Sequence, residues 1–395
     1  MADAFDPAET GFSTRAIHVG QAPDPQYGAV TTPIYQTATF AFRRIGETYG
    51  GYDYGRSHNP TRTALEQVMA SLESAKHALS FSTGMAAINA VLSLLKPGDH
   101  VLINDDVYGG TYRLLSSVFG NYGITFSLTD QTDLDKVEAA IRPETKLVWI
   151  ETPTNPLMKV VDIAAIAERA HARGAWVAVD NTFASPYLQR PLLLGADFVI
   201  HSATKYLGGH SDVVNGILAV NDDSLRARLY TYQNTTGCTP GPLDCYLVLR
   251  GIKTLGVRMR QHSANALALA QFLDAHPQVE EVLYPGLPGD RYHEVNTKNF
   301  ASGGAGDVAK GGHGGMLSFR VRGGEAKACA VVEKCRVFTL AESLGGVESL
   351  IEVPVAMTHA SLAGSDISID PSMIRVSVGI EDAEDLIADL EQALA

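Results

Sequence analysis

The sequence predicts an α/β fold, with a mostly parallel sheet in a large domain and a smaller α+β domain after it. Amphipathic helical segments such as 163–173 lie between some of the predicted strands. Strands that alternate with helices form a parallel sheet that is covered on both faces. Five short apolar segments are typical of buried strands in such a sheet: 78–81, 100–103, 146–150, 176–179 and 198–200.

The first 60 residues differ from the rest of the chain. They are rich in Gly, Pro, Tyr and Thr and show little helical periodicity. Such a segment buries little of itself, so we expect residues 1–60 to form an arm that contacts a neighbouring subunit. The large domain then spans 61–254. It begins with an amphipathic helix at 63–72, and a helix at 85–95 ends at Pro97-Gly98, a pair that stops helices.

The remainder, 255–395, is predicted to be a linking helix at 255–275 and a C-terminal α+β domain. A glycine-rich stretch at 303–315 contains Lys310 and His313. It has no Gly-Lys-Ser/Thr and no helix follows it, so we expect a surface loop there rather than a phosphate-binding loop. The other predicted elements of this domain are strands at 281–284, 316–320 and 374–378 and a helix at 383–395.

Composition excludes several classes of protein. The chain has 395 residues, 45% of them apolar, and a formal net charge of −13 spread along its length, which makes nucleic acid or an anionic membrane an unexpected partner. None of its apolar runs approaches the roughly 18 residues of a membrane span. The four cysteines form no C-x-x-C pair and the first residues are acidic, so we expect a cytoplasmic protein. The twelve histidines include no H-E-x-x-H, and we predict no metal site.

Two predicted strands end in groups that could act together. Lys205 follows the strand 198–200 within Ser202-Ala-Thr-Lys205, and Asp180 ends the strand 176–179. Side chains beyond the carboxyl ends of parallel strands share one edge of the sheet. A partly desolvated amine loses its proton readily. Pyridoxal phosphate needs such an amine for covalent attachment and a carboxylate beside its pyridine nitrogen. A surface lysine and a capping aspartate are the alternative interpretation.

A phosphate site is indicated at the same edge. Ser80-Phe-Ser-Thr-Gly84-Met85 joins a strand to a helix, and N–H groups at a helix N-terminus bind anions. Ser202 and Thr204 add hydroxyl donors. A simple strand-to-helix turn would explain the first segment alone. Together with Lys205, the donors favour a phosphate site.

Three further side chains are candidates. Tyr108 follows a strand and precedes glycines, so its ring could lie on a planar cofactor or pack on its own turn. Arg56, in Tyr54-Gly-Arg56, could be a solvated charge of the arm. Arg375 lies inside an apolar strand, where a guanidinium without a partner is costly, and a substrate carboxylate would satisfy it.

These motifs resemble the Cys/Met-metabolism family of pyridoxal-phosphate enzymes, which has the aspartate-aminotransferase-like (type I) fold. The resemblance extends from Thr14 to Glu381. The motifs that carry it are Tyr54-Gly-Arg56 with Asn59-Pro-Thr61, Gly84-Met-Ala-Ala87, Glu151-Thr-Pro-Thr-Asn-Pro156, Val179-Asp-Asn-Thr182 and His201-Ser-Ala-Thr-Lys-Tyr206.

The resemblance implies a role for each candidate. Lys205 would bind the cofactor covalently and move protons, and Tyr108 would stack on the cofactor and act as an acid/base. Asp180 would pair with the pyridine nitrogen. Tyr54 and Arg56 would reach the phosphate in the adjacent subunit, in a dimer or, as is usual in the family, a tetramer. The other cofactor-binding residues would be Gly84, Met85, Thr182, Ser202 and Thr204, and the substrate-binding residues would be Arg113, Asn155, Glu342, Ser343 and Arg375.

Three positions indicate which substrate within the family is expected. Gly110 stands where methionine γ-lyases typically carry Cys, and the family members that act on cystathionine share Arg113 and Glu342. Glu342 suits the distal ammonium of cystathionine and Arg113 its distal carboxylate. The resemblance therefore implies a cystathionine γ-lyase activity, with a γ-synthase activity as the alternative. A cystathionine β-lyase or a homocysteine-forming sulfhydrylase is a further alternative within the family. Two alternatives lie outside it: an aminotransferase of the same fold, and a regulatory protein that binds the cofactor. The second would need a DNA-binding segment, which the sequence does not show.

Overall fold

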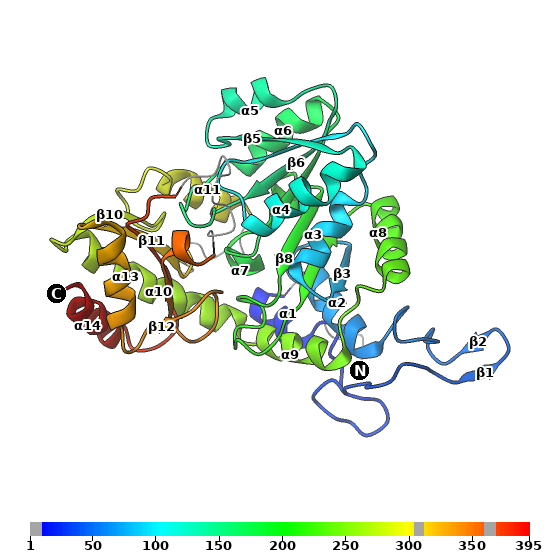
Figure 1. Cartoon of the computed structure of the whole chain (residues 1–395). Helices are drawn as coiled ribbons and strands as arrows, with labels where there is room; N and C mark the ends of the chain where they lie inside the picture. Colours follow the sequence, from blue (N-terminus) through cyan, green and yellow to red (C-terminus); the bar gives the residue numbers. More distant parts are fainter. Residues whose placement is uncertain (1–9, 304–311, 359–368) are drawn as a thin grey trace.

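A seven-stranded sheet forms the centre of the large domain (Figure 1). The computed structural model describes residues 10–303, 312–358 and 369–395. The strands lie in the order β3-β9-β8-β7-β6-β4-β5. Their bounds are β3 His77–Phe81, β4 His100–Asn104, β5 Thr125–Thr129, β6 Thr145–Glu151, β7 Trp176–Asp180, β8 Phe198–Ser202 and β9 Gly216–Val220.

Only β9 runs against the other six strands. It pairs antiparallel with both neighbours, β3 and β8, and all other pairs in this sheet are parallel. Six carboxyl ends therefore meet at one edge, and five of these six strands are predicted from the sequence. The strands β5 and β9 were not predicted from the sequence.

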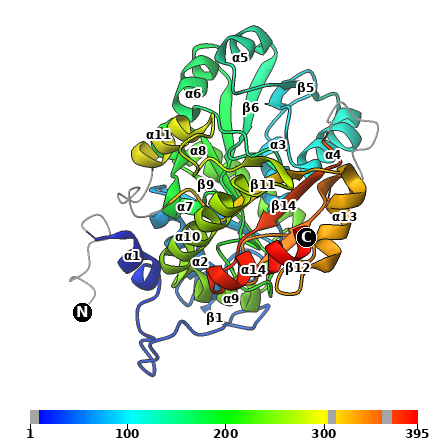
Figure 2. The same cartoon turned by 90° about the vertical axis from the view of Figure 1, so that its left-hand side faces the viewer.

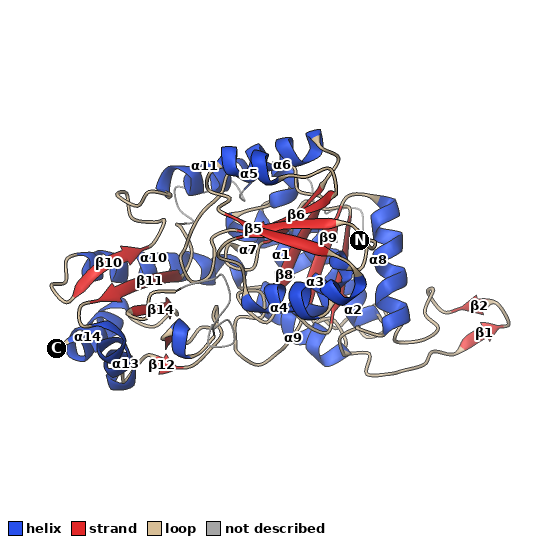
Figure 3. Cartoon of the chain, turned by 45° about the horizontal axis from the view of Figure 1, so that its top comes forward, coloured by secondary structure: helices blue, strands red, loops and turns tan. Residues whose placement is uncertain are grey.

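Helices cover both faces of this sheet (Figure 3). On one face, α2 and α9 pack on β8 and β9 through a shared apolar cluster, and on the other α3 packs on β3, β4 and β9. Asn59 and Thr83 cap α2 and α3 by accepting hydrogen bonds from backbone N–H groups of the first turn. The helices are α2 Pro60–Leu72, α3 Gly84–Leu92, α4 Gly109–Ser117, α5 Leu134–Ala140, α6 Ile163–Ala172, α7 Ser185–Leu188, α8 Asp223–Thr236 and α9 Pro242–Ile252.

A second sheet follows the long helix α10, Leu255–Asp274 (Figure 2). Its strand order is β10-β11-β14-β13-β12, and only the β12–β13 pair is parallel. Apolar residues of α10, α13 and α14 pack against it. The predicted small α+β region is therefore present. The elements are β10 Val279–Leu283, α11 His293–Gly303, β11 Met316–Val321, α13 Gly324–Lys334, β12 Thr339–Leu340, β13 Leu350–Glu352, β14 Met373–Ser377 and α14 Ala383–Leu394.

The arm has little structure of its own. Its helix α1, Phe12–His18, packs on the body, where Phe12 meets Tyr187 edge to face. Beyond it, a hairpin of β1, Phe42–Arg44, and β2, Glu47–Thr48, projects away from the large sheet (Figures 1 and 3). Ile45 at its tip is fully exposed. Contact of this arm with a neighbouring subunit remains a prediction.

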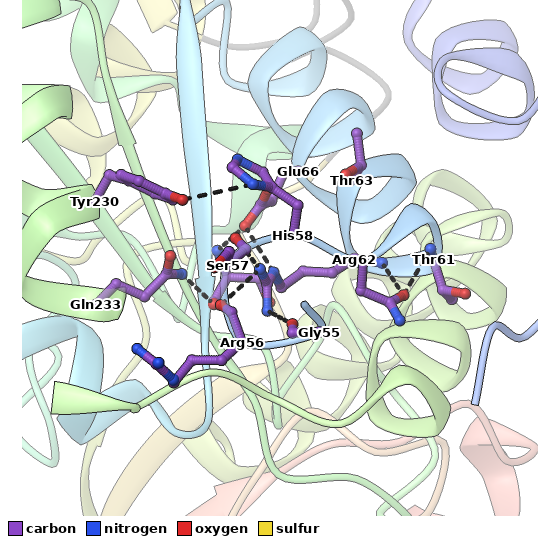
Figure 4. A network of polar contacts seen from close by, with 12 residues as sticks. Gly55, Arg56, Ser57, His58, Thr61, Arg62, Thr63, Glu66, Tyr230 and Gln233 are labelled. Atoms are coloured by element: carbon purple, nitrogen blue, oxygen red, sulfur yellow. Dashed lines mark hydrogen bonds and ion pairs between the residues drawn. The ribbon is translucent and has the colours of Figure 1, made fainter. Parts of the chain in front are cut away.

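The base of the arm is fixed by a buried arginine (Figure 4). Arg62 of α2 donates hydrogen bonds to the carbonyl oxygens of Gly55, Arg56 and Ser57. The Arg56 side chain points away from this network and donates to Asn234 of α8. The turn that carries Arg56 is thus held rigidly on the large domain.

Part of the glycine-rich stretch, residues 304–311, lies outside the described residues, so the loop expected at 303–315 is not tested. Within the described ranges, none of the helices has the length and apolarity needed to cross a membrane. The same residues contain no group of three or more His, Cys, Asp or Glu side chains arranged to hold a metal ion.

Candidate active site

A cavity of about 260 Å³ opens at the carboxyl edge of the seven-stranded sheet. One wall comes from the large domain and the other from the second domain. The predicted site residues that line it are Gly84, Met85, Tyr108, Asn155, Asp180, Thr182, Ser202, Thr204, Lys205, Glu342, Ser343 and Arg375.

Lys205 lies in the turn after β8. Its backbone N–H donates to the carbonyl of Ser202, and its Nζ donates to the hydroxyl of Ser343 at 2.5 Å. Burial and the nearby Arg375 guanidinium lower the pKa of Lys205 to about 8. The amine is therefore partly neutral, and nucleophilic, near neutral pH.

Asp180 ends β7 and is held by the residue two positions on. Thr182 donates to Asp180 Oδ1 from its backbone N at 3.0 Å and from its hydroxyl at 2.5 Å. Burial raises the pKa of Asp180, so a cationic group beside it would be needed to keep the carboxylate fully charged.

A second buried carboxylate, Glu151, was not predicted as a site residue. It ends β6 directly opposite Asp180 on β7 and also lines the cavity. Its Oε2 accepts from the backbone N–H of Tyr108 at 2.7 Å, and its Oε1 accepts from the Trp149 ring at 3.2 Å. Burial and the charge of Asp180 raise the pKa of Glu151 to about 8. The signal was available, because Glu151 follows an apolar strand as Asp180 does.

One end of the cavity suits an anion. Gly84 begins α3, and a Cβ built there would lie 2.9 Å from the Cβ of Ser202, so only glycine fits this approach. The backbone N–H of Ser202 donates to the hydroxyl of Thr182, and the hydroxyl of Thr204 accepts from the N–H of Asn215 at 3.1 Å. Hydroxyls and the N-terminus of α3 thus converge here.

Tyr108 lies at the start of α4 with its ring in the cavity wall. The ring also covers Gly110, where a built Cβ would lie only 2.3 Å from Tyr108 Cε1. A larger residue at 110 would displace the ring. Burial raises the pKa of the Tyr108 phenol.

Arg375, on β14, has an internal partner that the sequence did not reveal. Its Nη1 lies 2.9 Å from Glu352 Oε1 and donates to Asn155 Oδ1 at 3.1 Å. Its Nη2 donates to the carbonyl of Ser343 at 2.8 Å. The guanidinium therefore has a carboxylate partner within the chain, on β13, and the binding of a substrate carboxylate by Arg375 stays a prediction.

Three predicted residues do not line the cavity. Tyr54 and Arg56 belong to the arm, and Arg56 is bound to α8. Arg113 lies on α4, where its charge lowers the pKa of Tyr108 against the larger effect of burial. The structure therefore brings together twelve of the fifteen predicted site positions and leaves Tyr54, Arg56 and Arg113 outside.

The donor set fits pyridoxal phosphate. A partly neutral amine, a buried carboxylate and a cluster of hydroxyls at a helix N-terminus share one cavity. Lys205 would hold the aldehyde carbon, Asp180 the pyridine nitrogen, and Gly84, Met85, Ser202 and Thr204 the phosphate.

Several curated proteins are similar over nearly the whole chain. A cystathionine gamma-synthase from Mycobacterium tuberculosis is 53% identical over 386 residues, 98% of this chain and 97% of the relative. A cystathionine gamma-lyase from Dictyostelium discoideum is 50% identical over 384 residues, and a cystathionine beta-lyase from Coxiella burnetii is 48% identical over 386. Each alignment spans 96% of this chain and 97% of the relative.

The fold agrees with these similarities. The solved structure of metB from Corynebacterium glutamicum superposes with a TM-score of 0.94 at 49% identity and covers 99% of both chains. The predicted type I fold is therefore confirmed. A model of the Cys/Met metabolism PLP-dependent enzymes matches residues 13–395. The chain belongs to the Cys/Met metabolism PLP-dependent enzyme family.

Proposed function

We propose that the protein acts on the bond between the γ-carbon and the sulfur of L-cystathionine. In the γ-elimination direction, cystathionine and water yield L-cysteine, 2-oxobutanoate and ammonia. The observation that carries this proposal is the second-domain wall of the cavity, where Glu342 lines the cavity with Ser343, Arg375 and Lys205 and its charge acts on both Lys205 and Arg375. An anionic side chain there suits a substrate that has a second ammonium group.

Pyridoxal phosphate, when bound, withdraws electrons from the substrate and makes the protons on its carbon skeleton acidic. Asp180 would keep the pyridine nitrogen protonated, and Thr182 would orient Asp180 through its two hydrogen bonds. Gly84, Met85, Ser202 and Thr204 would hold the phosphate. Tyr54 and Arg56 of a second copy would complete this end, since they do not reach the cavity of their own chain. The proposed assembly is thus at least a dimer, and a tetramer fits two such dimers.

Lys205 would remove the α-proton, pass it on to the cofactor and, neutral again, remove a proton from the β-carbon. Its lowered pKa of about 8 suits a base near neutral pH. Tyr108, whose phenol stays protonated because its pKa is raised, would donate a proton to the departing sulfur. The thiol of cysteine would leave from the γ-carbon in this step.

Two sets of side chains would hold the two ends of the substrate. Arg375, Asn155 and Ser343 would bind the α-carboxylate at the reacting end. Glu342 would bind the distal ammonium, and Arg113 on α4 would meet the distal carboxylate.

A γ-synthase activity is the second candidate. It would form the same bond by adding cysteine to an activated homoserine ester. The cystathionine gamma-synthase from Mycobacterium tuberculosis, at 53% identity, favours it. Gly110 does not distinguish the γ-lyase from the γ-synthase. The lack of space beside Tyr108 disfavours a cysteine at that position.

A paired assay on the holoenzyme tests the proposal. L-cystathionine alone is scored for 2-oxobutanoate and cysteine, and an activated homoserine ester with cysteine is scored for cystathionine. We expect rapid oxo-acid release in the first assay. Rapid synthesis with slow cleavage would replace the lyase by the synthase. Stoichiometric amino transfer to 2-oxoglutarate would refute both.

A further inference from the structure

Glu352 and Arg375 form a buried ion pair between neighbouring strands. They lie directly opposite each other in the antiparallel register of β13 and β14, and their charged atoms are 2.9 Å apart. Their side chains are 0% and 3% exposed. Both charges are therefore removed from water, and each depends on the other for compensation.

The pair leaves hydrogen-bonding capacity unused. Glu352 Oε1 accepts from the hydroxyl of Thr358 at 2.7 Å as well as from Arg375. Among the described residues, Glu352 Oε2 and Arg375 Nε have no partner. Burial raises the pKa of Glu352 and lowers the pKa of Arg375, which means that burial disfavours both charged forms. A guanidinium with an unused N–H can donate a hydrogen bond to a second carboxylate.

The two members of the pair differ in their access to the cavity. Arg375 lines it together with its neutral partners Asn155 and Ser343, whereas Glu352 is not among the lining residues. A carboxylate that enters the cavity therefore meets a guanidinium whose charge is already balanced by the protein. Its electrostatic gain is smaller than it would be at an unpaired arginine.

We propose that Glu352 is a positioning residue that holds Arg375 and limits its affinity for carboxylates, so that the bound substrate shares the guanidinium with an internal competitor. This inference rests on the proposed function of Arg375 as the α-carboxylate site. The competition favours release, because the products of γ-elimination are carboxylates as well. Glu352 would thereby set the balance between substrate binding and product release.

The pair also acts on Lys205. The Arg375 charge lowers the pKa of the Lys205 amine, and the Glu352 charge raises it. Removing the charge of Glu352 would therefore move the pKa of Lys205 further below its ordinary value. This second consequence can be measured on the cofactor-free protein, independently of turnover.

The test uses Glu352→Gln, which keeps the size of the side chain and an oxygen acceptor for Thr358 and Arg375. The probe is butyrate, a simple carboxylate without an amino group, added to the holoenzyme in a calorimeter and in thermal unfolding. We expect the variant to be less stable alone, to bind butyrate about tenfold more tightly than the wild type, and to gain more in Tm from it. A structural defect would not tighten binding. Unchanged or weaker binding overturns the proposal.

Three further variants make the test decisive. Glu352→Asp keeps the charge but lengthens the ion pair, so a smaller tightening, about threefold, is expected; if the Gln variant cannot be purified, unchanged affinity of the Asp variant overturns the proposal. Glu73→Gln breaks another buried pair, with His201, neither of which lines the cavity, and butyrate affinity should not change. Tightening in that variant would make the effect non-specific and overturn the proposal.

Arg375→Gln separates this inference from the proposed function. Loss of butyrate binding in Arg375→Gln with no change in Glu352→Gln overturns only the role of Glu352. Wild-type butyrate binding in Arg375→Gln means that Arg375 does not hold the carboxylate. The proposed α-carboxylate role of Arg375 and the proposed role of Glu352 are then both overturned.

Discussion

The two walls of the cavity are built in different ways. On the large-domain wall, two key residues are held by neighbours in the chain: Thr182 holds the Asp180 carboxylate two positions away, and the backbone N–H of Lys205 donates to the carbonyl of Ser202. On the second-domain wall, the contacts join residues that are far apart in the sequence. Ser343 meets Lys205 across 138 positions, and Arg375 meets Asn155 across 220. The cofactor end is thus fixed locally, whereas the substrate end depends on how the second domain sits against the first.

Loss of the Lys205 amine should have the largest effect. We expect Lys205→Ala to lower turnover of cystathionine at least about 10³-fold, because both covalent attachment and proton transfer are lost. The absorbance of the bound cofactor and the rate of 2-oxobutanoate formation measure the two losses. Lys298→Ala, which removes an exposed lysine paired with Asp162, is the matched control and should behave as wild type. Substantial turnover in Lys205→Ala would refute the assignment.

Asp180→Asn tests the large-domain wall of the cavity without changing the shape of the side chain. The amide keeps an acceptor for Thr182 but cannot compensate a protonated pyridine, and we expect turnover to fall about 10²-fold. Affinity for the cofactor, measured by titrating the cofactor-free protein, should fall as well. Wild-type turnover would mean that the carboxylate does not serve the pyridine nitrogen.

The reactivity of Lys205 in the cofactor-free protein has a predicted pH dependence. Its folded pKa of about 8 lies below the ordinary value of 10.5, so the neutral amine is half formed near pH 8 and increases as pH rises. At pH 8 its neutral fraction should be about 100-fold larger than that of an exposed lysine, so its modification by an amine reagent should follow a titration centred near pH 8. Peptide mass spectrometry along a pH series measures the midpoint. A midpoint near 10.5 would show that burial does not shift this amine.

Glu342→Gln tests the second-domain wall. Loss of the negative charge should raise the KM for cystathionine about tenfold while leaving smaller substrates without a distal ammonium nearly unaffected. The ratio of kcat/KM for the two substrate types is the measurement. Equal losses on both would remove the proposed role of Glu342.

Thr182→Val gives the smallest expected effect. It removes the hydroxyl that donates to Asp180 and accepts from Ser202, but leaves the backbone N–H bond to Asp180 in place. One such hydrogen bond contributes about 1 kcal/mol, so turnover should fall about fivefold. The pKa of Asp180 should rise further, and the acid limb of the pH–rate profile should move to higher pH. A fall as large as that of Asp180→Asn would mean that the hydroxyl has a role of its own.

The contrast between contacts within a short segment and contacts across the chain explains what the sequence could predict. Lys205, Asp180 and the turn at Gly84 follow apolar strands by a few residues, so their meeting at one edge was predictable from the pattern alone. Glu151 carried the same signal and was overlooked. Glu352 was not predictable, because its importance comes from the pairing of β13 with β14, and a three-residue strand at 350–352 leaves no recognisable period.

The rigid base of the arm has a consequence for behaviour in dilute solution. Arg62 fixes the turn of Arg56 onto the large domain, so Tyr54 and Arg56 cannot fold back to serve their own cavity without breaking three hydrogen bonds. If they complete the phosphate end of a second copy, as proposed, then the affinity of each cavity for the cofactor depends on the association of two chains. Dilution alone would then release cofactor, and added pyridoxal phosphate would in turn drive chains together.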